Sequence, residues 1–315
     1  MLVMTIDEFS KDQIQYLQDI CSPMPVHLEP DIKNNSTLLN HVEVLITFGF
    51  DLTKETLEQM PSLKWVQVFQ TGVEHIPIEE LEERGILLTN VKGIYSTPMS
   101  EYVMSMILYY TRQLRRFIQE QQQHIWNREE LVDEAGGKTI AIFGAGTIGT
   151  AIAEKARMFG MHVLGVNTSG QLRPHFDEMV TLDNKEKALK EGDFIVLLLP
   201  ETKKTFHCIG RNELRLMKES AYLINIGRGG LVDTNALVNE LNQKTIQGAA
   251  LDVFEEDPLP KDHPLWDMNN VFITPHLSAK TIHFYDRCIE KFKMNFSRYQ
   301  KGETMIDKVD LDKGY

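Results

Sequence analysis

The sequence is poor in cysteine. Only three cysteines occur among 315 residues, at Cys21, Cys208 and Cys288. Their odd number and wide spacing provide no disulfide framework, and no CxxC pair or zinc-ligand spacing is present. We therefore expect free thiols in a reducing compartment. The histidines also lack metal-ligand spacing, so no metal site is expected.

The chain lacks an excess of positive charge. It has 33 lysines and arginines against 45 aspartates and glutamates, which gives a formal net charge of −12. No basic stripe interrupts this balance. A nucleic acid or an anionic membrane is therefore not expected as a partner, because both recruit proteins through clustered positive charge.

Long hydrophobic runs are also missing. The longest apolar stretch, around Val103–Tyr110, is too short to cross a bilayer. The segment Met1–Asp7 resembles a strand and lacks the basic and long apolar regions of a signal peptide. With an apolar content of 42% and a charged content of 25%, the composition is that of an ordinary globular protein. We expect a cytoplasmic protein.

What the chain does contain is a regular alternation of short apolar runs and helical patterns. Most of the runs are continuously apolar, which is typical of strands covered on both faces in parallel α/β sheets. A chain of 315 residues is longer than one core usually absorbs, so two domains are expected. The expected strands are Val42–Phe48, Trp65–Phe69, Ile86–Thr89, Thr139–Phe143, His162–Val166, Phe194–Leu199, Ala221–Ile226, Gly248–Val253 and Val271–Thr274.

One predicted helix is apolar on most of its circumference. Thr97 can cap it, and Pro98 suits its first turn. Its expected end lies near Arg112, Arg115 and Arg116, which suit a helix C-terminus. Such a helix must be buried on more than one side. Periodicity alone leaves two interpretations open, an interdomain core helix and a subunit interface.

A glycine-rich turn follows the predicted strand Thr139–Phe143 directly and opens a helical pattern. Gly144 permits a tight turn, Gly146 allows close approach of a pyrophosphate, and Gly149 allows the helix to pack against the strand. The helix N-terminus attracts phosphate charge. This context predicts a dinucleotide site.

The next predicted strand ends at Val166, where a carboxylate usually binds the ribose 2′-hydroxyl. This chain has Asn167 there, followed by Thr168 and Ser169, with Arg173 shortly after. A loop without an acid tolerates a 2′-phosphate, and these side chains can donate to one. NADP(H) is therefore favoured, while NAD(H) stays possible because Asn167 can still bond a plain ribose.

Three polar residues follow further predicted strands. Arg228 lies in a glycine-rich turn, Asp257 precedes Pro258, and His276 follows Pro275. If these strands are parallel neighbours, their carboxyl ends share the edge where open α/β sheets bind ligands. A cation, a carboxylate and an imidazole would then meet in one crevice. That set can hold a carboxylate-bearing substrate and move one proton.

The order of these motifs resembles the D-isomer-specific 2-hydroxyacid dehydrogenases, over nearly the whole chain and most strongly over Lys138–Ser278. The resemblance implies a flavodoxin-like substrate domain (residues 1–97 and 282–315) into which a Rossmann cofactor domain (residues 98–281) is inserted. It also implies a homodimer through the helix after Thr97. The matching motifs are Gly144–Gly149, Leu199-Pro200, Asn225–Gly230, Leu251–Phe254, Asp257-Pro258, His263–Trp266 and Thr274–His276.

The resemblance also implies roles for the three polar residues. Arg228 would bind the substrate carboxylate and keto oxygen. His276 would protonate the keto oxygen during reduction and act as base in the reverse direction. Asp257 would orient His276. The commonest pattern has glutamate at this position, so either the loop moves inward or the pair is held more loosely. Glu255 and Glu256 are nearby carboxylates that fit the spacing less well.

Further positions follow from the same resemblance. In the loop Gln70–Glu74, backbone N–H groups of Thr71, Gly72 and Val73 would hold the substrate carboxylate. Asp252 would bond the nicotinamide carboxamide, although a strand-end cap is an alternative. The other cofactor contacts implied are Thr147, Ile148, Leu199, Pro200, Thr205, Ile226 and Gly227.

The expected activity is reduction of a small 2-oxo acid to a D-2-hydroxy acid with NAD(P)H. The neutral Asn167 and the short chain favour the glyoxylate and hydroxypyruvate reductase branch. A D-lactate or short phosphoglycerate type of dehydrogenase is an alternative, which the lining near Val73, Tyr95 and Trp266 would decide. A nucleotide-sensing regulator or corepressor of the same fold is the alternative from another class.

Overall fold

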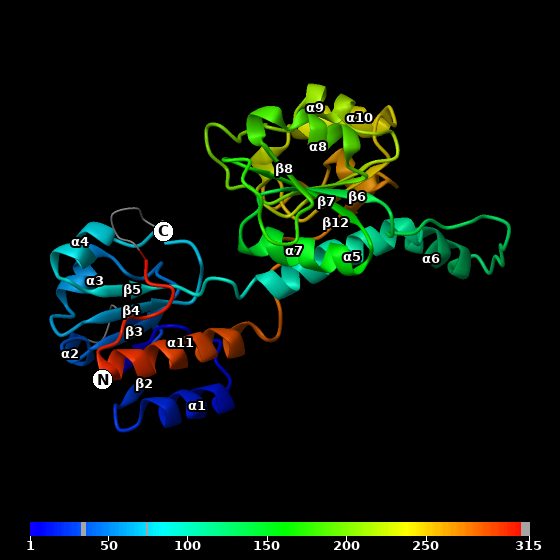
Figure 1. Cartoon of the computed structure of the whole chain (residues 1–315). Helices are drawn as coiled ribbons and strands as arrows, with labels where there is room; N and C mark the ends of the chain where they lie inside the picture. The colour runs from blue at the N-terminus through cyan, green and yellow to red at the C-terminus, as the bar shows by residue number, and fades with distance from the viewer. Residues whose placement is uncertain (33–35, 74, 310–315) are drawn as a thin grey trace. The chain divides into compact units, whose positions relative to one another are not determined.

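A computed structural model describes residues 1–32, 36–73 and 75–309 of the chain (Figure 1). The chain divides into two compact units, Met1–Ile94 with Thr281–Tyr315 (unit 1) and Tyr95–Lys280 (unit 2). The expected domain boundaries, after residues 97 and 281, lie three residues and one residue from these divisions.

The sheet of unit 1 has five parallel strands in the order β2-β1-β3-β4-β5. This is the flavodoxin-like order. The sequence did not predict β2, because its side chains are half-buried or exposed and include a histidine, so no apolar run marks it. The strands are β1 (Leu2–Met4), β2 (Val26–Leu28), β3 (Val44–Thr47), β4 (Trp65–Val68) and β5 (Leu87–Thr89).

The last helix of the chain belongs to unit 1. Trp65 of β4 stacks on Phe292 of this helix with ring centroids 5.2 Å apart, and its indole N–H donates to the hydroxyl of Thr89 at 2.8 Å. Buried aromatic contacts of this kind anchor the C-terminal segment to the first sheet. The helices of unit 1 are α1 (Lys11–Cys21), α2 (Ser36–Leu39), α3 (Lys54–Glu58), α4 (Ile78–Glu83) and α11 (Phe284–Lys301).

The sheet of unit 2 has seven parallel strands in the order β12-β11-β10-β9-β6-β7-β8. The strand order reverses between β6 and β9, as in a Rossmann fold, and this switch point is where such sheets bind ligands. The sequence did not predict β8, which is half-buried and partly polar. The strands are β6 (Thr139–Phe143), β7 (His162–Asn167), β8 (Glu178–Thr181), β9 (Phe194–Leu197), β10 (Tyr222–Asn225), β11 (Gly248–Leu251) and β12 (Val271–Ile273).

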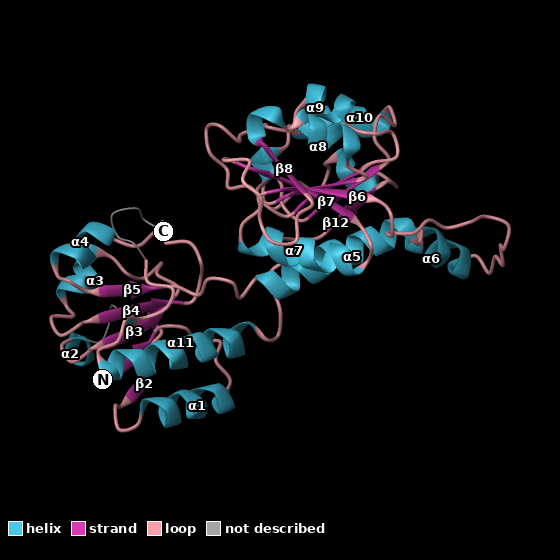
Figure 2. Cartoon of the chain, viewed as in Figure 1, coloured by secondary structure: helices cyan, strands magenta, loops and turns pink. Residues whose placement is uncertain are grey.

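Helices cover both faces of this sheet (Figure 2). Buried side chains of α5 and α7 pack on one face, and those of α8, α9 and α10 pack on the other. The expected α/β fold with two doubly wound parallel sheets is therefore confirmed. No helix in the described ranges is long and apolar enough to cross a membrane. The helices of unit 2 are α5 (Ser96–Thr111), α6 (Leu114–Gln122), α7 (Thr147–Met158), α8 (Glu186–Glu191), α9 (Arg211–Leu216) and α10 (Thr234–Asn242).

The apolar helix after Thr97 differs from its prediction at both ends. It begins at Ser96 and has no side-chain cap, so Thr97 lies inside the first turn. Pro98 is its third residue, where a missing N–H has no intrahelical partner to lose. The helix ends at Thr111, and the left-handed Gln113 (φ 51°) separates it from α6. Arg115 therefore lies in the first turn of a second helix.

The three cysteines are free and buried. Burial raises the pKa of Cys21 to about 12, and it also raises the pKa of Cys208 and Cys288. The thiols stay protonated at neutral pH and pack as small apolar side chains.

Candidate active site

The predicted site residues of unit 2 gather at the carboxyl edge of its sheet. Six loops carry them, the loops that follow β6, β7, β9, β10, β11 and β12. All these strands are parallel, so their carboxyl ends point to one edge. The glycine turn lies after β6, at the switch point of the sheet, where α/β folds bind ligands.

The glycine turn has the geometry that a dinucleotide phosphate needs. Gly144 has a φ of +116°, which other residues rarely adopt. A Cβ on Gly149 would lie 2.1 Å from the carbonyl oxygen of Gly144, so only glycine lets α7 start this close to the strand. A Cβ on Gly146 would meet no atom within 4 Å, so this backbone is open to a ligand. Thr147 and Ile148 begin α7, whose N–H groups attract phosphate.

The loop after β9 lies beside the glycine turn. Leu198 donates its N–H to the carbonyl of Phe143 at 2.8 Å. Further along, the hydroxyl of Thr205 donates to the carbonyl of Pro200 at 2.6 Å. Thr205 is buried and thus braces the Leu199-Pro200 segment, so its hydroxyl has a structural role besides the expected cofactor contact.

The loop after β7 is organised by Asn167. Its Oδ1 accepts the N–H groups of Ser169 at 3.0 Å and Gly170 at 2.6 Å, and its Nδ2 donates to the carbonyl of Gln171 at 3.2 Å. Asn167 therefore forms an Asx turn. The Oδ1 is therefore engaged in the turn, whereas the Nδ2 carries a second N–H that can still donate to a ribose hydroxyl.

Arg228 lies in the loop after β10, in a turn that Asn225 closes. The Nδ2 of Asn225 donates to the carbonyl of Arg228 at 3.0 Å, and its Oδ1 accepts the N–H of Gly227 at 3.2 Å. Ile226, the residue before Gly227, is buried and anchors the end of β10 in the core. The Arg228 side chain is exposed, and one Nη donates to the carbonyl of Gly227 at 2.8 Å. No carboxylate of the described residues forms an ion pair with it, so its other donors can bind a substrate carboxylate.

His276 and Asp257 lie together although 19 residues separate them in the chain. The His276 Nδ1 is 3.0 Å from the Asp257 Oδ2. The side chains are 55% and 49% exposed, so both are open to solvent and to a ligand. The shorter aspartate thus still reaches the ring. Because the carboxylate occupies Nδ1, the other ring nitrogen, Nε2, is left for a reacting group.

The backbone of His276 is held in an unusual conformation. Its φ of 55° is left-handed, which costs a non-glycine residue about 1–3 kcal/mol. Its N–H donates to the backbone carbonyls of Asp252 at 3.0 Å and Thr274 at 3.1 Å. This strained turn is where the chain leaves β12, and it sets the direction of the imidazole.

Asp252 holds the same turn with its side chain. This fully buried carboxylate accepts the N–H groups of Leu277 at 2.8 Å and Ser278 at 2.9 Å, as well as the hydroxyl of Thr274. Both its oxygens are occupied. The structure thus shows Asp252 holding the end of the strand, and its contact with a carboxamide stays a prediction.

Tyr102 extends this chain of hydrogen bonds from α5. Its hydroxyl is 2.8 Å from that of Thr274, and burial raises its pKa to about 12. The phenol therefore stays protonated and donates to Thr274, which in turn donates to Asp252. The sequence did not single out Tyr102, because within an apolar helix a tyrosine is indistinguishable from a core residue.

The predicted substrate loop of unit 1 follows β4. Asn90 donates to the carbonyl of Thr71 at 2.8 Å, and the neighbouring Gly72 is half-buried. The Val73 side chain is only 2% exposed and packs in the core of unit 1. The side chain therefore lines no surface, and the predicted contact of Val73 with the substrate carboxylate involves only its backbone N–H, so it stays a prediction. Glu74 lies outside the described residues.

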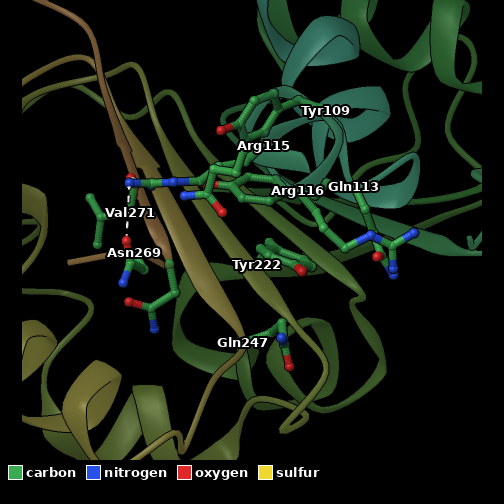
Figure 3. A pocket seen from close by; sticks show the side chains of 11 residues that line it. Tyr109, Gln113, Arg115, Arg116, Tyr222, Gln247, Asn269 and Val271 are labelled. Carbon is green, nitrogen blue, oxygen red and sulfur yellow. Dashed lines mark hydrogen bonds between the residues drawn. The ribbon is translucent and has the colours of Figure 1, made fainter. Parts of the chain in front are cut away.

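A cavity in unit 2 is lined by none of these residues (Figure 3). Its volume is about 250 Å³. Tyr222 is the first residue of β10 and Val271 the first of β12, so the cavity borders the amino edge of the sheet. No histidine or carboxylate lines it, so it contains no counterpart of the His276–Asp257 pair. Its lining is Tyr109, Tyr110, Gln113, Arg115, Arg116, Gln119, Tyr222, Gln247, Asn269, Asn270 and Val271.

The chain is similar to known proteins over most of its length. The family model described as "D-isomer specific 2-hydroxyacid dehydrogenase, NAD binding domain" matches residues 104–278. A glyoxylate reductase of Thermococcus litoralis is 35% identical over 285 residues, which cover 87% of this chain and 85% of that protein.

Solved structures resemble the chain over nearly its full length. A D-isomer specific 2-hydroxyacid dehydrogenase family protein of Aeromonas salmonicida is 33% identical, with a TM-score of 0.80 and 99% of each chain covered. A D-lactate dehydrogenase of Aquifex aeolicus, solved with NAD and lactic acid, is 27% identical, with a TM-score of 0.72 and 96% of each chain covered. The chain belongs to the D-isomer specific 2-hydroxyacid dehydrogenases, a family of NAD-dependent oxidoreductases.

Proposed function

We propose that this protein reduces a small 2-oxo acid of the glyoxylate or hydroxypyruvate type to a D-2-hydroxy acid, with NADPH as the favoured reductant. The observation that carries the proposal is the 3.0 Å contact between His276 Nδ1 and Asp257 Oδ2. This pair shares one sheet edge with the guanidinium of Arg228, which forms no ion pair with a carboxylate of the described residues. The similarity to a glyoxylate reductase supports the substrate class.

The residues divide the work of the reaction. The reduced dinucleotide supplies the hydride that forms the new C–H bond at the keto carbon. His276 donates a proton from Nε2 to the keto oxygen, which becomes the hydroxyl. Arg228 binds the substrate carboxylate with its planar fork of N–H donors. In the reverse direction, His276 takes the proton back.

Asp257 fixes which nitrogen of His276 reacts. An ionised carboxylate can only accept, so the hydrogen bond keeps a proton on Nδ1. After the ring has given up its Nε2 proton, it remains neutral with Nδ1 protonated, ready to be reprotonated at Nε2. The carboxylate also stabilises the charged ring before transfer.

The cofactor preference rests on the loop after β7. Asn167 places no negative charge beside a ribose 2′-phosphate, and the exposed Thr168 and Ser169 carry hydroxyl donors. Among the described residues, no carboxylate forms an ion pair with Arg173, so its guanidinium can bind the phosphate. NAD(H) remains a usable cofactor, because nothing in this loop repels a plain ribose.

The protein is also proposed to form a homodimer through α5 and the segment that follows it. No residue of α6 is buried. Ile118 is 53% exposed, Trp126 is 89% exposed and Leu131 is 88% exposed. Apolar side chains gathered on one segment mark an interaction surface. Light scattering after gel filtration should give twice the chain mass of 36.2 kDa, and Leu131→Glu should shift the mass towards the monomer.

Turnover of 2-oxo acids tests the proposed activity. Consumption of NADPH and NADH is followed by nicotinamide absorbance with glyoxylate, hydroxypyruvate, pyruvate and 3-phosphohydroxypyruvate. Glyoxylate or hydroxypyruvate with NADPH should give the highest kcat/KM. A maximum with pyruvate or the phosphorylated acid would instead identify a D-lactate or phosphoglycerate type. Absence of turnover across the panel, with dinucleotide still bound, would favour a nucleotide-sensing regulator.

A further inference from the structure

A second histidine–carboxylate pair lies close to the proposed catalytic pair. The Nε2 of His207 is 2.9 Å from an Oε2 of Glu255. Glu255 comes two residues before Asp257, in the loop after β11, whereas His207 lies in the loop after β9. The ring of His207 is therefore committed to a contact that joins two loops of the carboxyl edge.

The other oxygen of Glu255 holds the start of a helix. Its Oε1 accepts the backbone N–H of Thr234, the first residue of α10, at 2.8 Å. Burial opposes ionisation of Glu255, but the hydrogen bonds from Thr234 and His207 outweigh it and lower its pKa. Glu255 is thus ionised at neutral pH. Because it can only accept, the proton of the contact lies on the His207 Nε2.

The backbone of His207 reaches a third loop, the one that carries Arg228. Its N–H donates to the carbonyl of Gly230 at 2.7 Å. Its φ of 49° is left-handed, a conformation that persists only where the surroundings enforce it. His207 therefore joins the Arg228 loop through its backbone and the Asp257 loop through its ring.

The Arg228 and Asp257 loops also touch directly. A Cβ on Gly229 would lie 1.9 Å from the backbone of Phe254, so the two loops pack without a side chain between them. The N–H of Gly230 donates to a carboxylate oxygen of Glu201 at 3.1 Å. These contacts unite the loops after β9, β10 and β11. We name this set the loop junction, with His207, Gly229, Gly230 and Glu255 as its members.

We propose that Glu255 and His207 are positioning residues for the reaction, which hold the loop of Asp257 where its carboxylate meets His276 and keep that loop in register with Arg228. This inference rests on the proposed function. Neither residue touches reacting atoms. Glu255 acts through the two peptide units that separate it from Asp257, and His207 acts by holding Glu255.

A purely structural role is the competing explanation, because Glu255 also caps the first turn of α10. A cap contributes about 0.5–2 kcal/mol to stability. Its loss would lower the melting temperature and leave kcat unchanged for the folded enzyme. A positioning role instead lowers kcat, since a displacement of about 1 Å at a catalytic group can cost roughly 10²-fold.

The first experiment compares neighbouring carboxylates. Glu255→Ala should lower kcat about 10- to 100-fold, while the dinucleotide Kd changes less than about threefold, because the glycine turn is untouched. Glu255→Gln keeps an acceptor for the Thr234 N–H and a polar contact for His207, so it should recover most of the lost kcat. Glu256→Ala removes the same charge from an exposed neighbour and should match the wild type.

The second experiment asks whether Glu255 acts through Asp257. Once Asp257→Ala has removed the carboxylate, adding Glu255→Ala should lower kcat by less than about threefold more. Fully multiplicative losses would show that the two residues act independently and would overturn the inference. His207→Ala should reproduce the kcat loss of Glu255→Ala, and His207→Gln, which can still donate, should restore part of it.

The outcomes separate this inference from the proposed function. If the wild type is active and Glu255→Ala equals Glu256→Ala in kcat, the positioning role is wrong and the proposed function stands. If the wild type turns over no 2-oxo acid, the proposed function fails first. Should Glu255→Ala not fold, Glu255→Gln and His207→Ala decide. An unchanged kcat in His207→Ala then overturns the role of the loop junction.

Discussion

The two edges of the seven-stranded sheet in unit 2 differ in chemistry. The carboxyl edge carries the glycine turn, the exposed Arg228, and the left-handed His276 beside Asp257. The amino edge carries a cavity of about 250 Å³ lined by tyrosines, arginines and amides. There, Arg115 donates to the backbone carbonyl of Val271 at 2.9 Å (Figure 3).

The contrast follows from the direction of the strands. In a parallel sheet with crossover helices, the loops that leave the strands lead into helix N-termini, whose free N–H groups attract anions. The other edge receives helix C-termini, whose free carbonyls attract cations, and Arg115 there donates to the backbone carbonyl at the start of β12. A hollow at the amino edge is therefore no indication of acid–base chemistry. The carboxyl edge thus favours anions and the amino edge favours cations, so we expect substitutions at the two edges to have different effects.

The largest effect is expected at His276. His276→Ala should lower kcat about 10²- to 10⁴-fold, the usual contribution of a positioned acid or base. Steady-state kinetics with the best 2-oxo acid would measure it. His175→Ala is the matched control, because His175 is also an exposed, left-handed histidine of unit 2 (φ 69°). A near-normal kcat for His276→Ala would remove this residue from the mechanism.

Two substitutions in the glycine turn should separate its role in stability from its role in cofactor binding. Gly149→Ala places a Cβ against the Gly144 carbonyl, so overpacking should cost about 1–3 kcal/mol of stability. Gly146→Ala meets no protein atom, so the melting temperature should hold, yet its methyl group faces the expected pyrophosphate. Dinucleotide Kd should rise about tenfold in Gly146→Ala, about 1.4 kcal/mol. Equal Kd values for Gly146→Ala and the wild type would place the phosphate elsewhere.

A negative charge added at the carboxyl edge should change the cofactor preference, whereas the same charge at the amino edge should not. Asn167→Asp keeps the acceptor of the Asx turn and adds a charge that repels a 2′-phosphate. The ratio of kcat/KM values for NADPH and NADH should fall by roughly tenfold, which corresponds to about 1.4 kcal/mol. Asn269→Asp makes the same change at the amino-edge cavity and should leave the ratio unaltered. If both variants keep the wild-type ratio, the loop after β7 does not contact the ribose.

The smallest effect on catalysis is expected from Arg115. Arg115→Ala removes its hydrogen bond to the Val271 carbonyl and should lower stability by about 1 kcal/mol. Its kcat should stay within about twofold of the wild type, because the residue lies at the opposite edge from the chemistry. Thermal denaturation and steady-state kinetics test both parts. A large loss of kcat would show that the amino edge is coupled to catalysis.

Most of the fold could be predicted from local sequence. All nine expected strands occur, because continuous apolar runs mark strands buried on both faces. The strands β2 and β8 were missed because they are only partly buried. The predicted start of α5 was wrong. Thr97 is a residue type that often caps helices, but the helix begins at Ser96 and no side chain caps it.

For the site, the sequence by itself determined which residues follow which strands. The glycine spacing and the positions of Arg228, Asp257 and His276 are local patterns, and parallel strands bring their ends to one edge. The sequence also favoured Asp257 over its two neighbouring glutamates. The structure joins that residue to His276 and joins Glu255 to His207.

Only the tertiary structure decided which polar atoms meet. His207 and Glu255 are 48 residues apart, and Asp252 bonds residues more than 20 positions away. The side chain of Val73 lies in the core of unit 1, although the residue belongs to a loop. Periodicity and glycine spacing depend on the backbone of one segment, whereas these contacts depend on strand order, register and loop packing, which bring distant segments together.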